Sequence, residues 1–178
     1  MLFRSLSRFI GDITAGTSKN CFNAPIYSRT YDLSAGPEAT HLRFSGTTTV
    51  RGGMVAVNRS FWMQIYSGSS LLIEQNPLIS TNVSFSQDDS GVLRLATTNN
   101  AWGQYYLYGG TLRCEAPGVL PTNSLIQIGA VWKPYGTLDL NGYDQTLAMF
   151  KTGYNAIDPS HEMVMSSKIG RASCRERV

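Results

Sequence analysis

The phrases GGTLRCEA at residues 109–116 and YGTLDLNG at residues 135–142 decide the fold. Each contains a small residue, Gly110 or Gly136, that precedes an alternation of an apolar residue, any residue and a second apolar residue. SSLLIEQN at residues 69–76 and SGVLRLAT at residues 90–97 follow the same pattern upstream. This recurrence has to be explained before any single residue is interpreted. The leucines at the equivalent position of the four phrases are Leu71, Leu93, Leu112 and Leu138.

These leucines are separated by 22, 19 and 26 residues, an irregular period in the low twenties. A period of this size, built from two or three short strands, suits one coil of a right-handed, single-stranded parallel β-helix. One coil cannot bury its own apolar face, but coils stacked about 4.8 Å apart pair their backbone groups and share a core. The repetition therefore predicts an all-β solenoid in which the equivalent leucines form one internal column.

Alternation supports strands throughout the region from His41 to Phe150, where short apolar segments are bounded by Gly, Asn, Ser, Pro or Asp. Residues two apart in a strand point to the same face, so the side chains of each apolar set are expected on one face and the residues between them on the other. The pairs are Leu42 and Phe44, Val55 and Val57, Phe61, Met63 and Ile65, Leu71 and Ile73, Val83 and Phe85, Leu93 and Leu95, Leu112 and Cys114, Ile126 and Ile128, Leu138 and Leu140, and Leu147 and Met149.

An antiparallel β-sandwich or jelly roll is the alternative fold, because it shows the same alternation with a turn every 8–12 residues. The repeated phrases favour the solenoid. Strands of a sandwich need not resemble one another, whereas the coils of a solenoid occupy equivalent environments and select similar residues.

Residues 109–147 resemble the autotransporter-associated β-strand repeat, a module of passenger domains. The pattern of that repeat runs GGTL, then G-x-LP-x-x-S, then G-x-LDLNG-x-x-Q-T followed by an apolar residue. Cys114 replaces the usual aliphatic residue, and VWKPYG at residues 131–136 gives a longer, more aromatic turn. Residues 41–100 match only loosely. The matching residues are Gly110, Thr111, Leu112, Gly118, Leu120, Pro121, Ser124, Gly136, Leu138, Asp139, Leu140, Asn141, Gly142, Gln145, Thr146 and Leu147.

The resemblance implies a surface protein of the Gram-negative type, located outside the cell or on the outer membrane, whose solenoid acts as a stalk or adhesive surface. We therefore expect no catalytic residue, no cofactor and no metal. The expected partners are glycans, host or neighbouring cell surfaces, and the flanking coils of the intact protein. The leucines of the repeat would fill the interior, while its glycines and Asn141 would form strand boundaries and turns. These structural residues are Gly110, Leu112, Gly136, Leu138, Leu140, Asn141 and Gly142.

Both ends of the chain resemble translated sequencing adapter. IGRASCRERV at residues 169–178 fits the conceptual translation of a common adapter, and MLFRS at residues 1–5 fits the opposite one. Without these ends the basic and acidic residues are equal in number, so the formal charge of +3 does not indicate an anionic partner such as nucleic acid. We expect a fragment with solenoid repeats at 41–150 and an irregular end at 151–168. Residues 6–40 stay unassigned, with further coils as one option.

No apolar run approaches the roughly 20 residues of a membrane-spanning helix. Aromatic residues are the notable surplus, since alternation sends some of them outward onto a long flat face. There they could stack on sugar rings or contact a partner; packing between coils is the alternative. The candidate contact residues are Trp62, Trp102, Tyr106 and Trp132.

The alternative functions are a carbohydrate-active β-helix enzyme, of the polysaccharide lyase or hydrolase type, and a carbohydrate-binding β-module. Asp88 and Asp89 form an adjacent carboxylate pair in the turn-like stretch SQDDSG, which is also typical of a solvated turn. Arg94 and Arg113 occupy equivalent outward positions on successive coils, so they should be neighbours. The histidines, His41 and His161, are far apart and lie in no nucleophile motif.

Asp139, Asn141 and Asp144 crowd oxygen atoms into one turn, as in a calcium loop. The EF-hand spacing fails, because Tyr143 stands where an oxygen ligand is required and no Glu follows at the twelfth position. We therefore expect a turn cap at this position, with the side-chain amide of Asn141 as a candidate for it.

Overall fold

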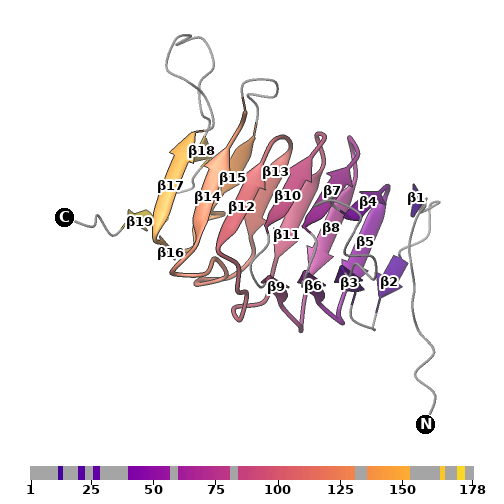
Figure 1. Cartoon of the computed structure of the whole chain (residues 1–178), viewed down its shortest axis with the longest axis horizontal. Helices are drawn as coiled ribbons and strands as arrows, with labels where there is room; N and C mark the ends of the chain where they lie inside the picture. The colour runs from indigo at the N-terminus through magenta and orange to yellow at the C-terminus, as the bar shows by residue number, and fades with distance from the viewer. Residues whose placement is uncertain are drawn as a thin grey trace, which may run out of the picture.

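The computed structural model describes residues 12–13, 20–22, 26–28, 40–56, 60–80, 84–130, 136–152, 165–166 and 172–174. Within these ranges the chain is a right-handed parallel β-helix built of stacked coils, without any helix (Figure 1). The predicted solenoid is thus confirmed. The sandwich alternative is wrong, because every pairing between strands is parallel. A search of the same ranges finds no helix suited to crossing a bilayer.

Two long sheets form opposite stretches of each coil and contain seven strands each. Sheet A has the spatial order β1-β4-β7-β10-β12-β14-β17, and sheet B has the order β18-β15-β13-β11-β8-β5-β2 (Figure 1). The strands of sheet A are β1 (Asp12–Ile13), β4 (Thr40–Phe44), β7 (Phe61–Ile65), β10 (Phe85–Asp88), β12 (Gln104–Leu107), β14 (Leu125–Ile128) and β17 (Met149–Thr152). Those of sheet B are β2 (Asn20–Phe22), β5 (Thr47–Val50), β8 (Ser70–Ile73), β11 (Val92–Leu95), β13 (Thr111–Cys114), β15 (Thr137–Asp139) and β18 (Met165–Ser166).

A third, shorter side completes the coils. It contains β3 (Ile26–Ser28), β6 (Met54–Ala56) and β9 (Leu78–Ser80), and separately β16 (Gln145–Leu147) paired with β19 (Ala172–Cys174). The strands β1, β2 and β3 pair with β4, β5 and β6, so residues before 41 take part in coil stacking. The strand β19 lies inside the terminal segment that resembles adapter.

The predicted internal column is present in sheet B. Leu71 pairs with Leu93, Leu93 with Leu112, and Leu112 with Leu138. All four side chains are buried. Because coils repeat in register, Leu93, Leu112 and Leu138 each rest on the leucine of the coil before. This contiguous burial is the main stabilising contribution available to such short strands. Thr48 occupies the same column on the preceding coil.

A second internal column, formed by inward-facing residues of sheet A, is aromatic. Phe61 and Phe85 stack with ring centroids 5.9 Å apart, and Tyr105 continues the column 6.5 Å from Phe85. The hydroxyl of Tyr105 donates to Oε1 of Gln87, whose Nε2 donates to the carbonyl of Thr111 across the coil. A buried glutamine is thereby satisfied inside the core.

One predicted pair, Leu147 and Met149, is divided between the two faces. In β6 the buried residues are Met54 and Ala56, so Val55 points outward. Met149 is 52% exposed, because a bend at Ala148 separates β16 from β17 and Leu147 alone faces the core. Val57 and Val83 lie outside the described residues.

The turns explain several residues of the repeat phrase. Asn141 and Gly142 both have positive φ, 51° and 80°, which fits the predicted turn dipeptide. Its cap differs from the expectation, since Oδ1 of Asp139 accepts from the backbone N–H of Asn141 while the Asn141 amide contacts the previous coil. At Gly136 a Cβ would lie 2.7 Å from the carbonyl oxygen of Leu107, so close coil approach requires glycine there.

Candidate functional site

The outer face of sheet A carries aromatic side chains on neighbouring coils. In the pairing of β7, β10 and β12, Trp62, Ser86 and Tyr106 lie in one outward column. The residues on either side of them in each strand face the core, as the buried Phe85 and Tyr105 show. Trp62 and Tyr106 therefore lie two coils apart, with a small residue between them.

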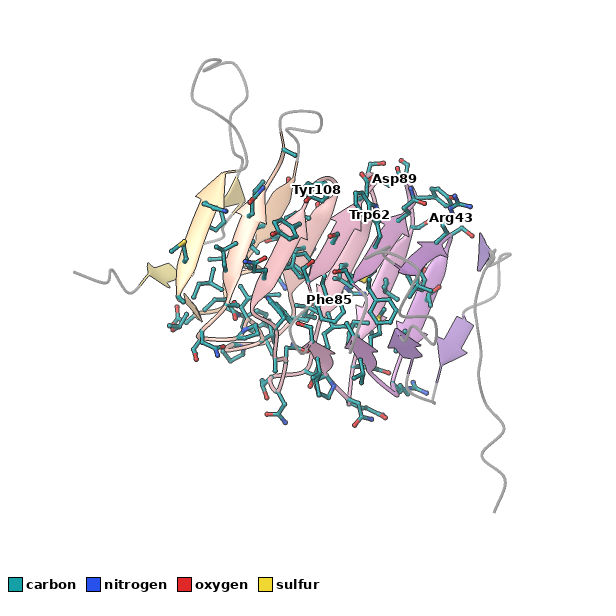
Figure 2. All side chains as sticks on the ribbon, in the orientation of Figure 1. Arg43, Trp62, Phe85, Asp89 and Tyr108 are labelled. Atoms are coloured by element: carbon teal, nitrogen blue, oxygen red, sulfur yellow. The ribbon has the colours of Figure 1, made fainter. Side chains whose placement is uncertain are left out.

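Tyr108 joins these two residues, and we call Trp62, Tyr106 and Tyr108 the aromatic patch. Tyr108 follows β12 two residues after Tyr106, and the two rings are parallel within 8° with centroids 5.6 Å apart. The ring of Tyr108 also lies 5.5 Å from that of Trp62. Tyr108 directly follows β12, whereas Trp62 is the second residue of β7, and Figure 2 shows the two labelled residues in the upper part of the solenoid, where Asp89 is also labelled.

The coil between the aromatic rings has short side chains that are buried although they point outward. Ser86 is 5% exposed and Asp88 is 4% exposed. Ser86 is flanked by Trp62 on one coil and Tyr106 on the next, so these large side chains shield it from water. The aromatic rings of Trp62 and Tyr106 therefore lie on either side of a buried polar residue, Ser86.

Neutral hydrogen-bonding groups surround the patch. Gln104 Oε1 accepts from the hydroxyl of Tyr106 at 2.7 Å, and Gln64 Oε1 accepts from Nε of Arg43 at 2.8 Å. Arg43, Gln64 and Asp88 lie in one outward column, so a cation and a carboxylate stand on the two sides of one amide. The opposite charges of Arg43 and Asp88 balance along this edge of the patch.

One of the predicted aromatic contact residues, Trp102, does not join the patch. Trp102 lies inside the coil, only 2% exposed, edge-on to Phe85 and 5.5 Å from Tyr105. The expectation that it contacts a partner is wrong, because the core encloses its ring. Trp132 lies outside the described residues. The sequence predicts Trp62 and Tyr106 as contact residues and gives Tyr108 only as one of the surplus aromatic residues, since a linear pattern does not show that Tyr108 reaches Trp62 two coils away.

The arginine pair predicted for the rival enzyme site exists as a stacked pair. Arg94 pairs directly with Arg113 in sheet B. Nε of Arg94 lies 2.6 Å from Oε1 of Glu115, and Nη2 of Arg113 donates to Oδ1 of Asn141 at 2.7 Å. Nε of Arg113 lies 3.4 Å from the same Glu115 oxygen, an ion-pair distance without hydrogen-bond geometry. These arginines form an electrostatic cluster around Glu115.

Asp88 and Asp89 shape the turn from sheet A to sheet B. Oδ1 of Asp88 accepts from the backbone N–H of Asp89 at 2.6 Å, and Oδ1 of Asp89 accepts from the N–H of Ser90 at 3.0 Å. Asp89 has a positive φ of 73°. Local hydrogen bonds of this kind are typical of a turn, in which short polar side chains stabilise an otherwise uncommon backbone conformation.

Three protonated side chains, those of Tyr105, Tyr108 and Cys114, have pKa values raised above their usual values. Burial raises the pKa of the Tyr105 hydroxyl well above its usual value. Burial, with the neighbouring Tyr106 as a smaller cause, also raises the pKa of Tyr108. Burial followed by the charges of Asp139 and Glu115 raises the pKa of the Cys114 thiol to about 12. These three groups therefore stay protonated at neutral pH.

In the ranges that the structure describes, no group of three or more His, Cys, Asp or Glu side chains is arranged to hold a metal ion. The turn of Asp139 and Asn141 is instead bonded to Arg113 and to its own backbone. The outer face of sheet A thus carries the aromatic patch, whereas the outer face of sheet B carries ion-paired side chains. No protein-family model, curated protein or solved structure matches the chain.

Proposed function

We propose that this chain is a non-catalytic segment of a secreted or cell-surface β-solenoid, like the passenger domains of autotransporters, and that it acts as a stalk or adhesive surface. The observation that carries the proposal is the stacking of the repeated phrase, with Leu93, Leu112 and Leu138 in register. Repeated coils lengthen the solenoid and enlarge its outer surface, because each added coil extends the stack by about 4.8 Å.

The remaining residues of the repeat phrase support the same proposal through their structural roles. Ser124 Oγ donates to the carbonyl of Pro121, and the Ser124 carbonyl accepts from the N–H of Met149 on the next coil. Gln145 accepts from the N–H of Leu120 and donates to the carbonyl of Ala116. The residues that make the phrase recognisable hold coils together, and a stalk requires nothing more of them.

The cellular location is tested by display. The full chain, preceded by an export signal and followed by an outer-membrane barrel translocator, is produced in a Gram-negative host. We expect the chain on the cell surface, where added proteinase K trims it to a resistant core, because stacked parallel strands leave little backbone open to cleavage. Leu112→Asp is the matched control and should be displayed but completely digested. Retention of the wild-type chain inside the cell, or digestion as complete as that of the variant, would contradict the proposal.

The absence of catalysis needs its own experiment. The chain is incubated with pectin-like and alginate-like polymers in the presence of calcium, and new chain ends are measured over time. We expect no turnover, since Arg94 and Arg113 interact with Glu115 and Asn141. Turnover that is lost in Arg113→Ala would establish a polysaccharide lyase in place of the function proposed.

A further inference from the structure

We propose, building on the adhesive role above, that the aromatic patch binds an uncharged polysaccharide that runs parallel to the solenoid axis. The patch is formed by Trp62, Tyr106 and Tyr108 on the outer face of sheet A. This inference names the ligand class and the face that takes it, which the stalk or adhesive role leaves open.

The geometry of the patch is already set without a ligand. Tyr108 contacts both Tyr106 and Trp62, so the three rings restrain one another on top of a sheet. Trp62 and Tyr106 stand two coils apart, which places them about 10 Å from each other along the axis. Rings that are ordered in advance lose little conformational entropy on binding. An extended polymer lying along the outward column would meet Trp62 first and Tyr106 after it.

The charge distribution selects an uncharged ligand. Among the outward residues of β7, β10 and β12, the charged residue is Asp88, and it is 4% exposed. The exposed cations Arg43 and Lys151 lie on other strands of sheet A, β4 and β17. A uronate or sialate chain would therefore find no cation among the outward residues of the three strands that carry the patch. The outward residues concerned are Trp62, Gln64, Ser86, Asp88, Gln104 and Tyr106.

The polar groups at the rim suit sugar hydroxyls. Pyranose rings present apolar C–H faces and a border of hydroxyl groups, and so require apolar rings beside neutral donors and acceptors. The amides of Gln64 and Gln104, together with the hydroxyls of Tyr106 and Tyr108, provide those groups. The outer face of sheet B differs, because ion pairs such as Arg113 with Asp139, whose Nε and Oδ2 atoms are 3.7 Å apart, occupy it.

Affinity electrophoresis tests the proposal with the full chain. Native gels contain one of four uncharged polymers, hydroxyethylcellulose, xyloglucan, galactomannan or laminarin, or one of three charged ones, polygalacturonate, alginate or heparin. We expect at least one uncharged polymer to retard the chain and the charged polymers to retard it less. Trp62→Thr, Tyr106→Ser and Tyr108→Ser should each weaken the retarding interaction about tenfold or more.

Tyr66→Ser is the matched control. Tyr66 is an aromatic residue at the end of β7 that is 37% exposed and lies outside the patch. Its removal should leave binding unchanged. Far-UV circular dichroism confirms that each variant keeps its strands. In a second measurement, the polymer that retards the chain should change the tryptophan fluorescence of the wild type, and Trp62→Phe should abolish that change while the buried Trp102 still fluoresces.

The proposal is overturned if none of the uncharged polymers retards the wild-type chain, if a charged polymer binds best, or if Tyr66→Ser weakens binding as much as the patch variants do. Binding that all three patch variants retain would also overturn it. Each of these failures is separable from failure of the surface role, because proteinase K shaving of displayed chains does not depend on any sugar.

Discussion

Leu112 lies directly over Leu93 in the parallel pairing of β13 with β11, and neither side chain is accessible to water. The two residues come from phrases that resemble each other in sequence, GGTLRCEA and SGVLRLAT. The likeness of the phrases thus has a physical cause: both leucines fill the same place in successive coils, and each forms part of the surface on which the other packs.

Removing one leucine from this column should therefore affect stability strongly. Leu112→Ala should lower the free energy of unfolding by about 2–5 kcal/mol, because the cavity lies between coils that cannot collapse independently. Urea unfolding followed by circular dichroism measures it. Thr111→Ala, an outward change on the same strand, should cost less than about 1 kcal/mol. Equal costs for the two variants would mean that the column contributes no more than the surface does.

A buried amide at the corner of the coil gives a second prediction. Oδ1 of Asn100 accepts from the N–H of Leu78, and its Nδ2 donates to the carbonyls of Thr97 and Val119. Asn100→Ala removes all three hydrogen bonds and leaves buried backbone groups unpaired, so unfolding should become easier by about 3 kcal/mol. The Leu78 amide should also exchange its hydrogen faster. Asn99→Ala, at an exposed neighbour, should change neither quantity, and an unchanged Leu78 exchange rate in Asn100→Ala would refute the assignment.

Two glycines of the coils, Gly110 and Gly103, should respond differently to substitution by alanine. Gly110 has φ of +70°, and a Cβ there would collide with the carbonyl oxygen of Gly91 on the preceding coil. Gly110→Ala should therefore cost about 2–4 kcal/mol through backbone strain and overpacking. At Gly103 a Cβ would meet no atom within 4 Å, and Gly103→Ala should gain a few tenths to about 1 kcal/mol. Thermal unfolding of both variants checks the difference, and the same sign for both would be the contrary result.

Glu115 should make a small, salt-dependent contribution. Its carboxylate lies near Nε of Arg94 and Nε of Arg113, but the arginine side chains are 40% and 41% exposed. Water and salt screen such pairs, so Glu115→Gln should cost no more than about 1 kcal/mol and almost nothing in about 1 M NaCl. Urea unfolding at low and high salt measures this. A cost above about 2 kcal/mol that persists at high salt would show instead that the carboxylate acts through buried hydrogen bonds.

Much of the fold could be predicted from sequence because stacked coils impose the same environment repeatedly. The column of leucines, the Asn141 and Gly142 turn and the pairing of Arg94 with Arg113 all follow from the spacing of similar phrases. These residues occupy clear positions within the repeated phrase. Their side-chain direction follows from the alternation along a strand, and their neighbours follow from the step of one coil between equivalent strands.

The site was less predictable because it depends on corners and on contacts between coils. Trp102 lies in an irregular segment between strands, where alternation gives no direction, and its ring enters the core. Tyr108 reaches Trp62 over an intervening coil whose Ser86 is small enough to leave room for both rings. Asp88 is outward in the pattern yet buried in the structure, where its carboxylate accepts from the backbone N–H of Asp89. Burial of this kind is a property of the assembled surface, not of one strand.

Cys114 provides a test of how closely the interior is sealed. It follows Leu95 in its column, is fully buried, and its thiol has a pKa raised to about 12 by burial, with smaller contributions from Asp139 and Glu115. Because the thiolate is the reactive form, a background of Cys21→Ser and Cys174→Ser should react with Ellman's reagent at about pH 8 at least a hundredfold more slowly when native than when unfolded in urea.

The raised pKa of the Cys114 thiol determines how the stability of the protein changes with pH. The unfolded thiol releases its proton near pH 8.5, whereas the folded one holds it to about 12, so the unfolded chain binds fewer protons between these values. The stability contributed by the neutral thiol is complete below about pH 8.5 and is lost as the pH rises towards 12. Cys114→Ala in the same background should flatten the fall in unfolding free energy between about pH 8.5 and 10. Native labelling as fast as in urea, or parallel pH profiles for the two proteins, would show that water reaches the column at this coil.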